Sequence, residues 1–163
     1  MKKNISFFWV FAVLIAFSAC KKYEDGPFLT LRTPEQRIEG NWESESIEGS
    51  YLDYFNDLLS NIGDSVVVIR NLSDLELEAE FEKNGECELE IRGRAEIEMM
   101  NGSIARIPFS ESMDGNWRFK DDKEVIEIDI DDEEIIWEII KLTNKELVVD
   151  WEEINTTIEF EKD

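Results

Sequence analysis

Hydrophobic and polar residues alternate along much of this chain. From Leu75 to Glu82, apolar residues occupy every second position and glutamates fill all of the positions between them. A period of two places apolar side chains on one face of a β-strand and charged side chains on the other. The same alternation, or a short apolar run, predicts further strands at residues 41–47, 87–99, 104–113, 116–120, 125–130, 135–142, 146–152 and 156–161.

The connections between these segments are short and polar. Asn84-Gly85 and Asn101-Gly102 are typical of hairpin turns, and the first predicts a type I′ turn because both residues tolerate a positive φ. Pro108 cannot donate a ladder hydrogen bond, so it predicts a sheet edge or a bend in its strand. About nine short strands with one apolar face predict an all-β domain, either a barrel or a sandwich.

One segment departs from the period of two. Apolar residues recur there at intervals of three and four, which predicts one helix near residues 51–62, ended by Gly63 as its C-cap. Residues 66–69 then predict a short strand or a packed loop. At the mouth of a barrel, this helix would act either as a lid or as a plug that completes the core.

The first residues predict a secretory signal peptide, residues 1–19. Lys2 and Lys3 precede an apolar run at residues 7–17, and the small residues Ser18 and Ala19 follow it. As a helix this run would be about 16 Å long, which is too short to cross a ~30 Å hydrocarbon core.

The charge of the chain excludes several classes of function. There are 17 Lys and Arg against 39 Asp and Glu, with no His, so the formal net charge is −22. Without histidine there is no Ser-His or Cys-His nucleophile pair and no zinc site built on imidazole. A charge of this sign repels phosphate backbones, so nucleic acid is not an expected partner. Most carboxylates alternate with apolar residues and so face solvent, and we expect no enzyme.

The segment Phe17-Ser18-Ala19-Cys20 resembles a bacterial lipobox, with Phe17 where Leu is usual. The resemblance implies cleavage before Cys20 and a lipid anchor on its thiol, which would attach the protein to a membrane. The alternative is an ordinary signal peptide followed by a chance cysteine. Residues 20–39 then read as a lipidated tether, because prolines limit regular structure there.

Two acidic residues near the expected anchor bear on localisation. Glu24 and Asp25 resemble the export signal that places Bacteroidota lipoproteins on the outer face of the outer membrane. We therefore expect a surface-exposed lipoprotein of the outer membrane, with a periplasm-facing anchor as the alternative.

Two Gly-x-Trp units carry a second resemblance. Gly40-Asn41-Trp42 opens the first expected strand, and Gly115-Asn116-Trp117 follows later. The first unit, the lipobox and the strand-turn-strand segment at residues 137–147 resemble the lipocalin-like lipoproteins of Bacteroidota. This resemblance implies that residues 40–163 form an antiparallel up-and-down β-barrel of about 8–10 strands.

The candidate site residues follow from these expectations. Trp42, Trp117, Trp137 and Trp151 are the candidate ligand-binding residues, and core packing is the alternative for each of them. The acidic turn at residues 129–134 has oxygen ligands that suit calcium but lacks EF-hand spacing, so a solvated turn is the alternative. Otherwise we expect no metal and no cofactor. Cys87 has no base beside it in sequence and is expected to be a small buried residue.

The expected function is the binding of a small apolar or amphipathic molecule inside the barrel of a membrane-anchored monomer. Such a binder needs an apolar cavity of about 300 Å³ or more. The alternative is a packed barrel without a ligand, which would serve the cell envelope as a structural or protein-interaction module.

Overall fold

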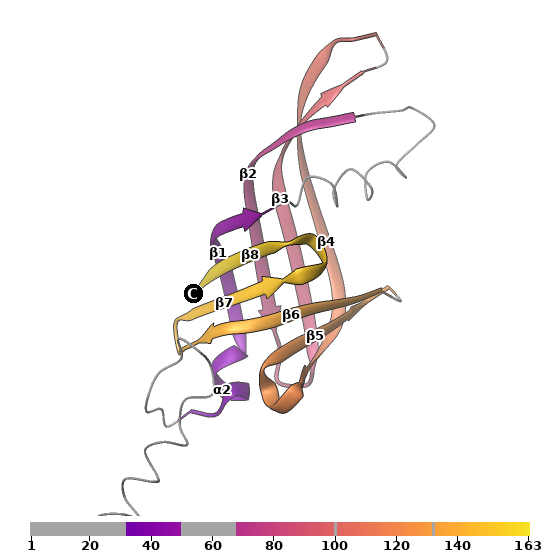
Figure 1. Cartoon of the computed structure of the whole chain (residues 1–163). Helices are drawn as coiled ribbons and strands as arrows, with labels where there is room; N and C mark the ends of the chain where they lie inside the picture. The colour runs from indigo at the N-terminus through magenta and orange to yellow at the C-terminus, as the bar shows by residue number, and fades with distance from the viewer. Residues whose placement is uncertain (1–31, 50–67, 100, 132) are drawn as a thin grey trace, which may run out of the picture.

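A computed structural model describes residues 32–49, 68–99, 101–131 and 133–163. In these residues eight antiparallel strands pair in chain order, and β8 pairs with β1 to close a barrel (Figure 1). The prediction of an all-β, antiparallel up-and-down barrel is confirmed. The strands are β1 (Gly40–Gly49), β2 (Val68–Phe81), β3 (Glu86–Glu98), β4 (Ile104–Lys120), β5 (Val125–Ile130), β6 (Glu133–Leu142), β7 (Glu146–Trp151) and β8 (Thr156–Lys162).

The observed bounds of strand β4 differ from the predicted ones. The sequence predicts two strands, at residues 104–113 and 116–120, but the structure continues one strand through Asp114 and Gly115. Gly115 does not break the strand. It allows a close approach, because a Cβ at this position would lie 2.5 Å from the carbonyl oxygen of Asp129.

Strands β2, β3 and β4 extend beyond the closed part of the barrel (Figure 1). Strand β4 pairs with β3 over its length up to Asn116, but it pairs with β5 only over Asn116–Lys120. Pro108 therefore lies on a free edge in the described part of the chain, and the edge prediction is confirmed. Ile69, Leu72 and Ala95 form a small second core in this extension.

The Asn-Gly turns are present, but the first is not type I′. In the β2–β3 turn Gly85 has a φ of +91°, whereas Asn84 does not have a positive φ. The Asn84 side chain instead accepts a hydrogen bond from the amide of Glu86 at 2.9 Å. The turn therefore needs left-handed backbone at the glycine alone.

A short helix, α2 (Pro34–Ile38), closes one end of the barrel. The hydroxyl of Thr33 accepts a hydrogen bond from the Gln36 amide, Pro34 occupies the first turn, and the Ile38 side chain is fully buried. Arg37 is also buried, and its guanidinium donates to the carbonyl oxygen of Leu142 at 2.8 Å. The predicted tether at residues 20–39 is therefore wrong in its last part, because these residues pack against the barrel.

Other predictions concern residues that the structure does not describe. The signal peptide, Cys20 and the helix near residues 51–62 all lie outside the described ranges. Within those ranges, no helix has the length and apolar character that a membrane-spanning helix requires.

Candidate functional site

An apolar cavity of about 100 Å³ lies inside the barrel, toward the end opposite α2. All eight described strands contribute at least one side chain to its wall. The alternation predicted from the sequence is the reason, because each strand directs every second side chain inward. The lining residues are Ile47, Leu75, Leu77, Leu89, Ile91, Glu111, Met113, Ile130, Glu133, Ile135, Trp137, Trp151, Ile154, Thr156 and Ile158.

The cavity is smaller than the 300 Å³ expected of a ligand binder. Aromatic side chains fill much of the barrel, with the rings of Trp137 and Phe160 5.6 Å apart and those of Phe81 and Trp137 6.3 Å apart. A cavity of ~150 Å³ lined by aliphatic and aromatic side chains is known to hold benzene. The cavity here is smaller than that, so it suits a short alkyl chain or an apolar group smaller than a benzene ring.

Two of the four candidate tryptophans line this cavity. Trp137 lies at its inner end on β6, fully buried, and its indole Nε1–H has no hydrogen-bond partner among the described residues. Trp151, at the end of β7, packs edge-on against Trp137 with 6.3 Å between ring centroids. The structure therefore brings together the two tryptophans nearest the C-terminus.

The other two tryptophans lie away from the cavity, near the end that α2 closes. Trp42 is buried, and its Nε1–H donates to the Ile38 carbonyl at 2.7 Å. Trp117 is half-buried, and its Nε1–H donates to the Glu82 carbonyl at 2.9 Å. Both indoles satisfy backbone carbonyls beside α2 or the β2–β3 turn, which is a packing role. Their ligand-binding assignment therefore has no geometric support.

Two acidic residues at the cavity were not among the predicted site residues. Glu111 on β4 and Glu133 on β6 both line it, while most other acids face outward. The alternation of residues along the strands already indicated that these two side chains face inward. Glu111 has the same parity as the inward-facing Met113, and Glu133 has the same parity as Ile135 and Trp137. Neither carboxylate has an ion pair within the described ranges.

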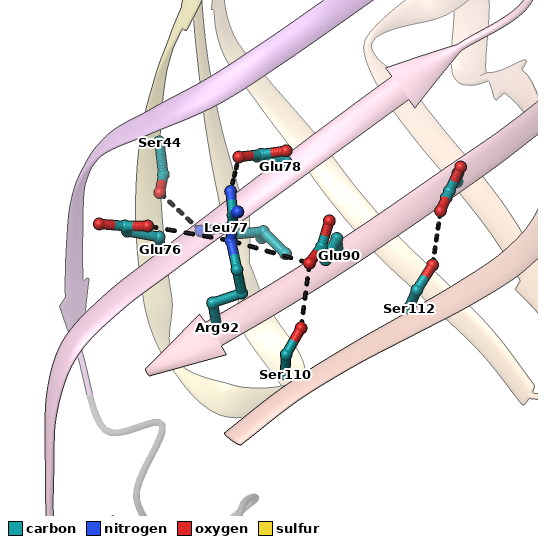
Figure 2. A network of polar contacts seen from close by, with 9 residues as sticks. Ser44, Glu76, Leu77, Glu78, Glu90, Arg92, Ser110 and Ser112 are labelled. Carbon is teal, nitrogen blue, oxygen red and sulfur yellow. Dashed lines mark hydrogen bonds and ion pairs between the residues drawn. The ribbon is translucent and has the colours of Figure 1, made fainter. Parts of the chain in front are cut away.

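The outer face of β2, β3 and β4 carries a network of charged and hydroxyl side chains (Figure 2). Arg92 contacts the carboxylates of Glu76, Glu78 and Glu90, and the Ser110 hydroxyl donates to Glu90 at 3.0 Å. These side chains are partly exposed and span neighbouring strands. They partly neutralise the acidic outer face, and Glu78 and Glu90 also line a polar hollow of about 130 Å³ beside β1. Because solvent screens partly exposed ion pairs, the network balances charge more than it adds stability.

Strand β1 diverges from β2 beside this network. The β1–β2 ladder reaches only to Glu43 and Glu78, and β1 has an irregularity between Ser44 and Ser46. The Ser44 hydroxyl accepts a hydrogen bond from the Leu77 amide at 2.8 Å (Figure 2). This side chain satisfies an amide that the ladder leaves unpaired.

A buried carboxylate lies on the outer face of β5. Glu127 is 0% exposed and forms ion pairs with Arg118 and Lys120 of the neighbouring strand β4. Arg118 also pairs with Asp129 at 2.9 Å, and Lys120 pairs with Glu134 at 2.8 Å. Two acids of the candidate calcium turn are therefore held by cations. Among the residues described, which omit Asp132, no group of three or more ligands could hold a metal ion.

Cys87 is buried in the core near the β2–β3 turn. Burial, together with the charges of Asp114 and Asp129, raises the pKa of the Cys87 thiol to about 11. The thiol is therefore protonated at neutral pH, whereas a nucleophilic cysteine needs a depressed pKa.

No protein-family model and no curated protein matches the chain. The lipocalin-like resemblance therefore rests on the motifs quoted above, and the candidate site rests on the cavity inside the barrel, which all eight described strands line.

Proposed function

We propose that this protein is a lipoprotein of the outer membrane whose lipocalin-like barrel binds the apolar part of a small molecule. The lipobox-like segment before Cys20 supports the anchor. The apolar cavity supports the binding, and its wall is aliphatic and aromatic apart from Glu111, Glu133 and Thr156. Apolar cavities with a few placed polar groups are typical small-molecule sites.

The size of the cavity limits the ligand. At about 100 Å³ it is smaller than sites for drug-sized molecules and than the ~150 Å³ cavity that holds benzene, so the bound part is a short alkyl chain or a similarly small apolar group. Burial of such a group contributes roughly 0.8 kcal/mol per methylene, which favours binding without any change in the barrel.

A packed barrel without a ligand is the second candidate, and one observation favours it. The half of the barrel near α2 is filled by fully buried side chains that include Trp42, Phe81 and Leu142. In that case the protein would act through its surface, as a structural or protein-interaction module of the envelope.

Mass spectrometry under native conditions tests the two candidates on the full chain purified from its own membrane. We expect a bound mass that disappears on unfolding. Met113→Trp should lower the bound fraction about tenfold, because Met113 lines the cavity and a larger side chain fills it. Met99→Trp is the matched control, since Met99 is exposed and lies outside the cavity wall. An empty barrel in every preparation would favour the packed-barrel function.

The anchor is tested separately. Cys20→Ala should move the protein from the membrane pellet to the supernatant, because the thiol that carries the lipid is lost. Cys87→Ala is the control and should leave the protein in the pellet, since Cys87 is buried within the barrel. Retention of Cys20→Ala in the pellet would contradict lipidation at this residue.

A further inference from the structure

Strand β4 has a long free edge in the described part of the chain. Its ladder with β3 runs from Ile104 to Asn116 without an irregularity, whereas its ladder with β5 begins only at Asn116. From Ile104 to Asp114 the strand therefore has β3 on one side and no described strand on the other (Figure 1). A regular, exposed edge of this kind is a template for pairing with another strand.

Along this edge the backbone of every second residue points away from β3. The amide of Trp117 donates to the Gly85 carbonyl at 2.8 Å. At the other end of the same register, the amide of Met99 donates to the Ser103 carbonyl at 2.9 Å. Both bonds place the odd-numbered residues of β4 in the pairs that bond to β3. The even-numbered residues of Ile104–Asp114 therefore direct their N–H and C=O groups to the free side, and all of them are exposed.

Pro108 is compatible with pairing at this edge. It is even-numbered, so its missing N–H faces the free side and costs the β3 ladder nothing. A proline removes one donor from an edge and so weakens its pairing. The amides of Arg106, Ser110, Ser112 and Asp114 still face the free side.

Two further features distinguish the β4 edge from the β2 edge of the same extension. The β2–β3 ladder has two register shifts between Ile69 and Glu76, and such irregularities interrupt pairing. Exposed apolar side chains also gather at β4. Among the described residues the exposed large apolar side chains are Met99, Ile104 and Ile107, of which two lie on β4 and the third lies just before the turn into it.

The side chains of the β4 edge are complementary to a second copy of the same edge. A two-fold axis at Ser110 pairs two such strands antiparallel and keeps the even-numbered residues opposite each other. Arg106 then lies opposite the partner's Asp114, and the symmetry repeats this pair of opposite charges. Asp114 forms no ion pair with a described residue, and the Arg106 side chain is 78% exposed. On the other face of the sheet Ile107 lies opposite the partner's Met113.

We propose that the β4 edge binds β4 of a second copy of this chain, antiparallel and centred on Ser110. The two extensions then form one continuous sheet, in which Arg106 lies between Glu96 of its own chain and the partner's Asp114. The pairing bonds the outward amides and covers Ile107. The chains repel each other through their net charge, but the Debye length is about 8 Å at physiological salt, so acids on distant strands oppose the pairing little. The dimer adds an interaction surface to the proposed function and does not depend on the cavity.

Single cysteines test the register. Ser110→Cys places two thiols at the two-fold axis, with Cα atoms about 5.5 Å apart, which suits a disulfide. Ser112→Cys is the matched control on the same face, because the symmetry separates its two Cα atoms by about 14 Å. Each full-length variant is oxidised with copper phenanthroline in cells that produce it, and non-reducing electrophoresis measures the linked fraction. We expect a linked dimer for Ser110→Cys alone, with the parent chain as the background from its own cysteines.

Charge reversal tests the complementarity. Arg106→Asp sets like charges opposite each other twice in the dimer, so it should raise the dimer dissociation constant about tenfold. Asp114→Arg should do the same, and the two substitutions together should restore most of the affinity because the charges are exchanged. Arg94→Asp is the matched control, since Arg94 is exposed on β3 and away from the edge. Sedimentation equilibrium of the full chain in detergent measures the constant, and melting curves show that each variant is folded.

Each outcome supports the pairing or overturns it. A chain that sediments as a monomer, with no linked product for Ser110→Cys, would overturn the dimer. Equal linking of Ser110→Cys and Ser112→Cys would overturn the register. A dimer that Arg106→Asp weakens no more than Arg94→Asp does would use another surface. A linked product that is not twice the mass of the chain would show a different protein at the edge and would overturn the second copy. None of these results bears on ligand binding in the barrel.

Discussion

Replacing Trp42 with alanine should lower the free energy of unfolding by about 3–5 kcal/mol, as for other fully buried large aromatic residues. Trp42 is 1% exposed, and its Nε1–H donates to the Ile38 carbonyl at 2.7 Å. The ammonium of Lys162 lies 4.8 Å from the centre of its ring and also donates to the Arg37 carbonyl. The substitution therefore opens a cavity and loosens the contact between α2 and the barrel. Urea unfolding, followed by circular dichroism, measures the loss.

Two further variants show which part of Trp42 matters. Trp42→Phe keeps an aromatic ring but leaves the Ile38 carbonyl without its donor, so we expect a loss of about 1–3 kcal/mol. Trp117→Ala is the matched control, because Trp117 is half-buried and its loss should cost less than that of Trp42. Equal losses for Trp42→Ala and Trp117→Ala would contradict the central packing role of Trp42.

The double variant Arg118→Met with Lys120→Met should destabilise the barrel by about 3 kcal/mol, because it leaves a buried carboxylate without its cations. Glu127 is 0% exposed and is paired with both side chains. Methionine retains an apolar stem that continues to cover the carboxylate, so the variant removes the charge more than the packing. Thermal unfolding at pH 7 and at lower pH measures the effect.

The pH dependence and a third substitution identify the cause. In the double variant we expect the pKa of Glu127 to be higher in the folded state than in the unfolded state. The loss is then greatest above that folded pKa and diminishes as the pH falls toward the unfolded pKa. Glu127→Gln in the same background should restore most of the stability at pH 7.

An exposed ion pair provides the control for this experiment. Arg106 is paired with Glu96 at 3.1 Å, and the arginine side chain is 78% exposed. Arg106→Met should change the stability by less than about 1 kcal/mol, because solvent screens such a pair. A pH-independent loss in the double variant, or no restoration by Glu127→Gln, would show that packing rather than the buried charge matters.

The alternation of residues predicted most of the fold correctly. It assigned the inward and outward faces of the strands, and the short polar turns implied antiparallel neighbours. It failed at Gly115, where a glycine that resembled a break allows β4 to pass close to β5. It also failed at residues 34–38, where Pro34 begins a helix instead of excluding one. Both errors arise because a glycine or a proline has several structural uses, and the neighbours in space decide between them.

The candidate site could be predicted only in part. The period of two already placed Trp137 inward and the glutamates of β2 outward, and it placed Glu111 and Glu133 inward as well. Their place in the cavity wall was not evident from the sequence, because the chain has 39 acidic residues and only the structure shows which of them lie beside the cavity. Trp42 and Trp117 were candidates by residue type alone, and the structure places their indoles on backbone carbonyls near α2.

By itself the sequence determined which side of each strand faces solvent, because side-chain direction depends only on the local period. That local pattern explains the acidic outer surface and the apolar interior of the barrel. The tertiary structure decided how far the interior is filled, which tryptophans meet and which two acids reach the cavity. These properties depend on strand register and on closure between β1 and β8, and both involve contacts between residues far apart in the chain.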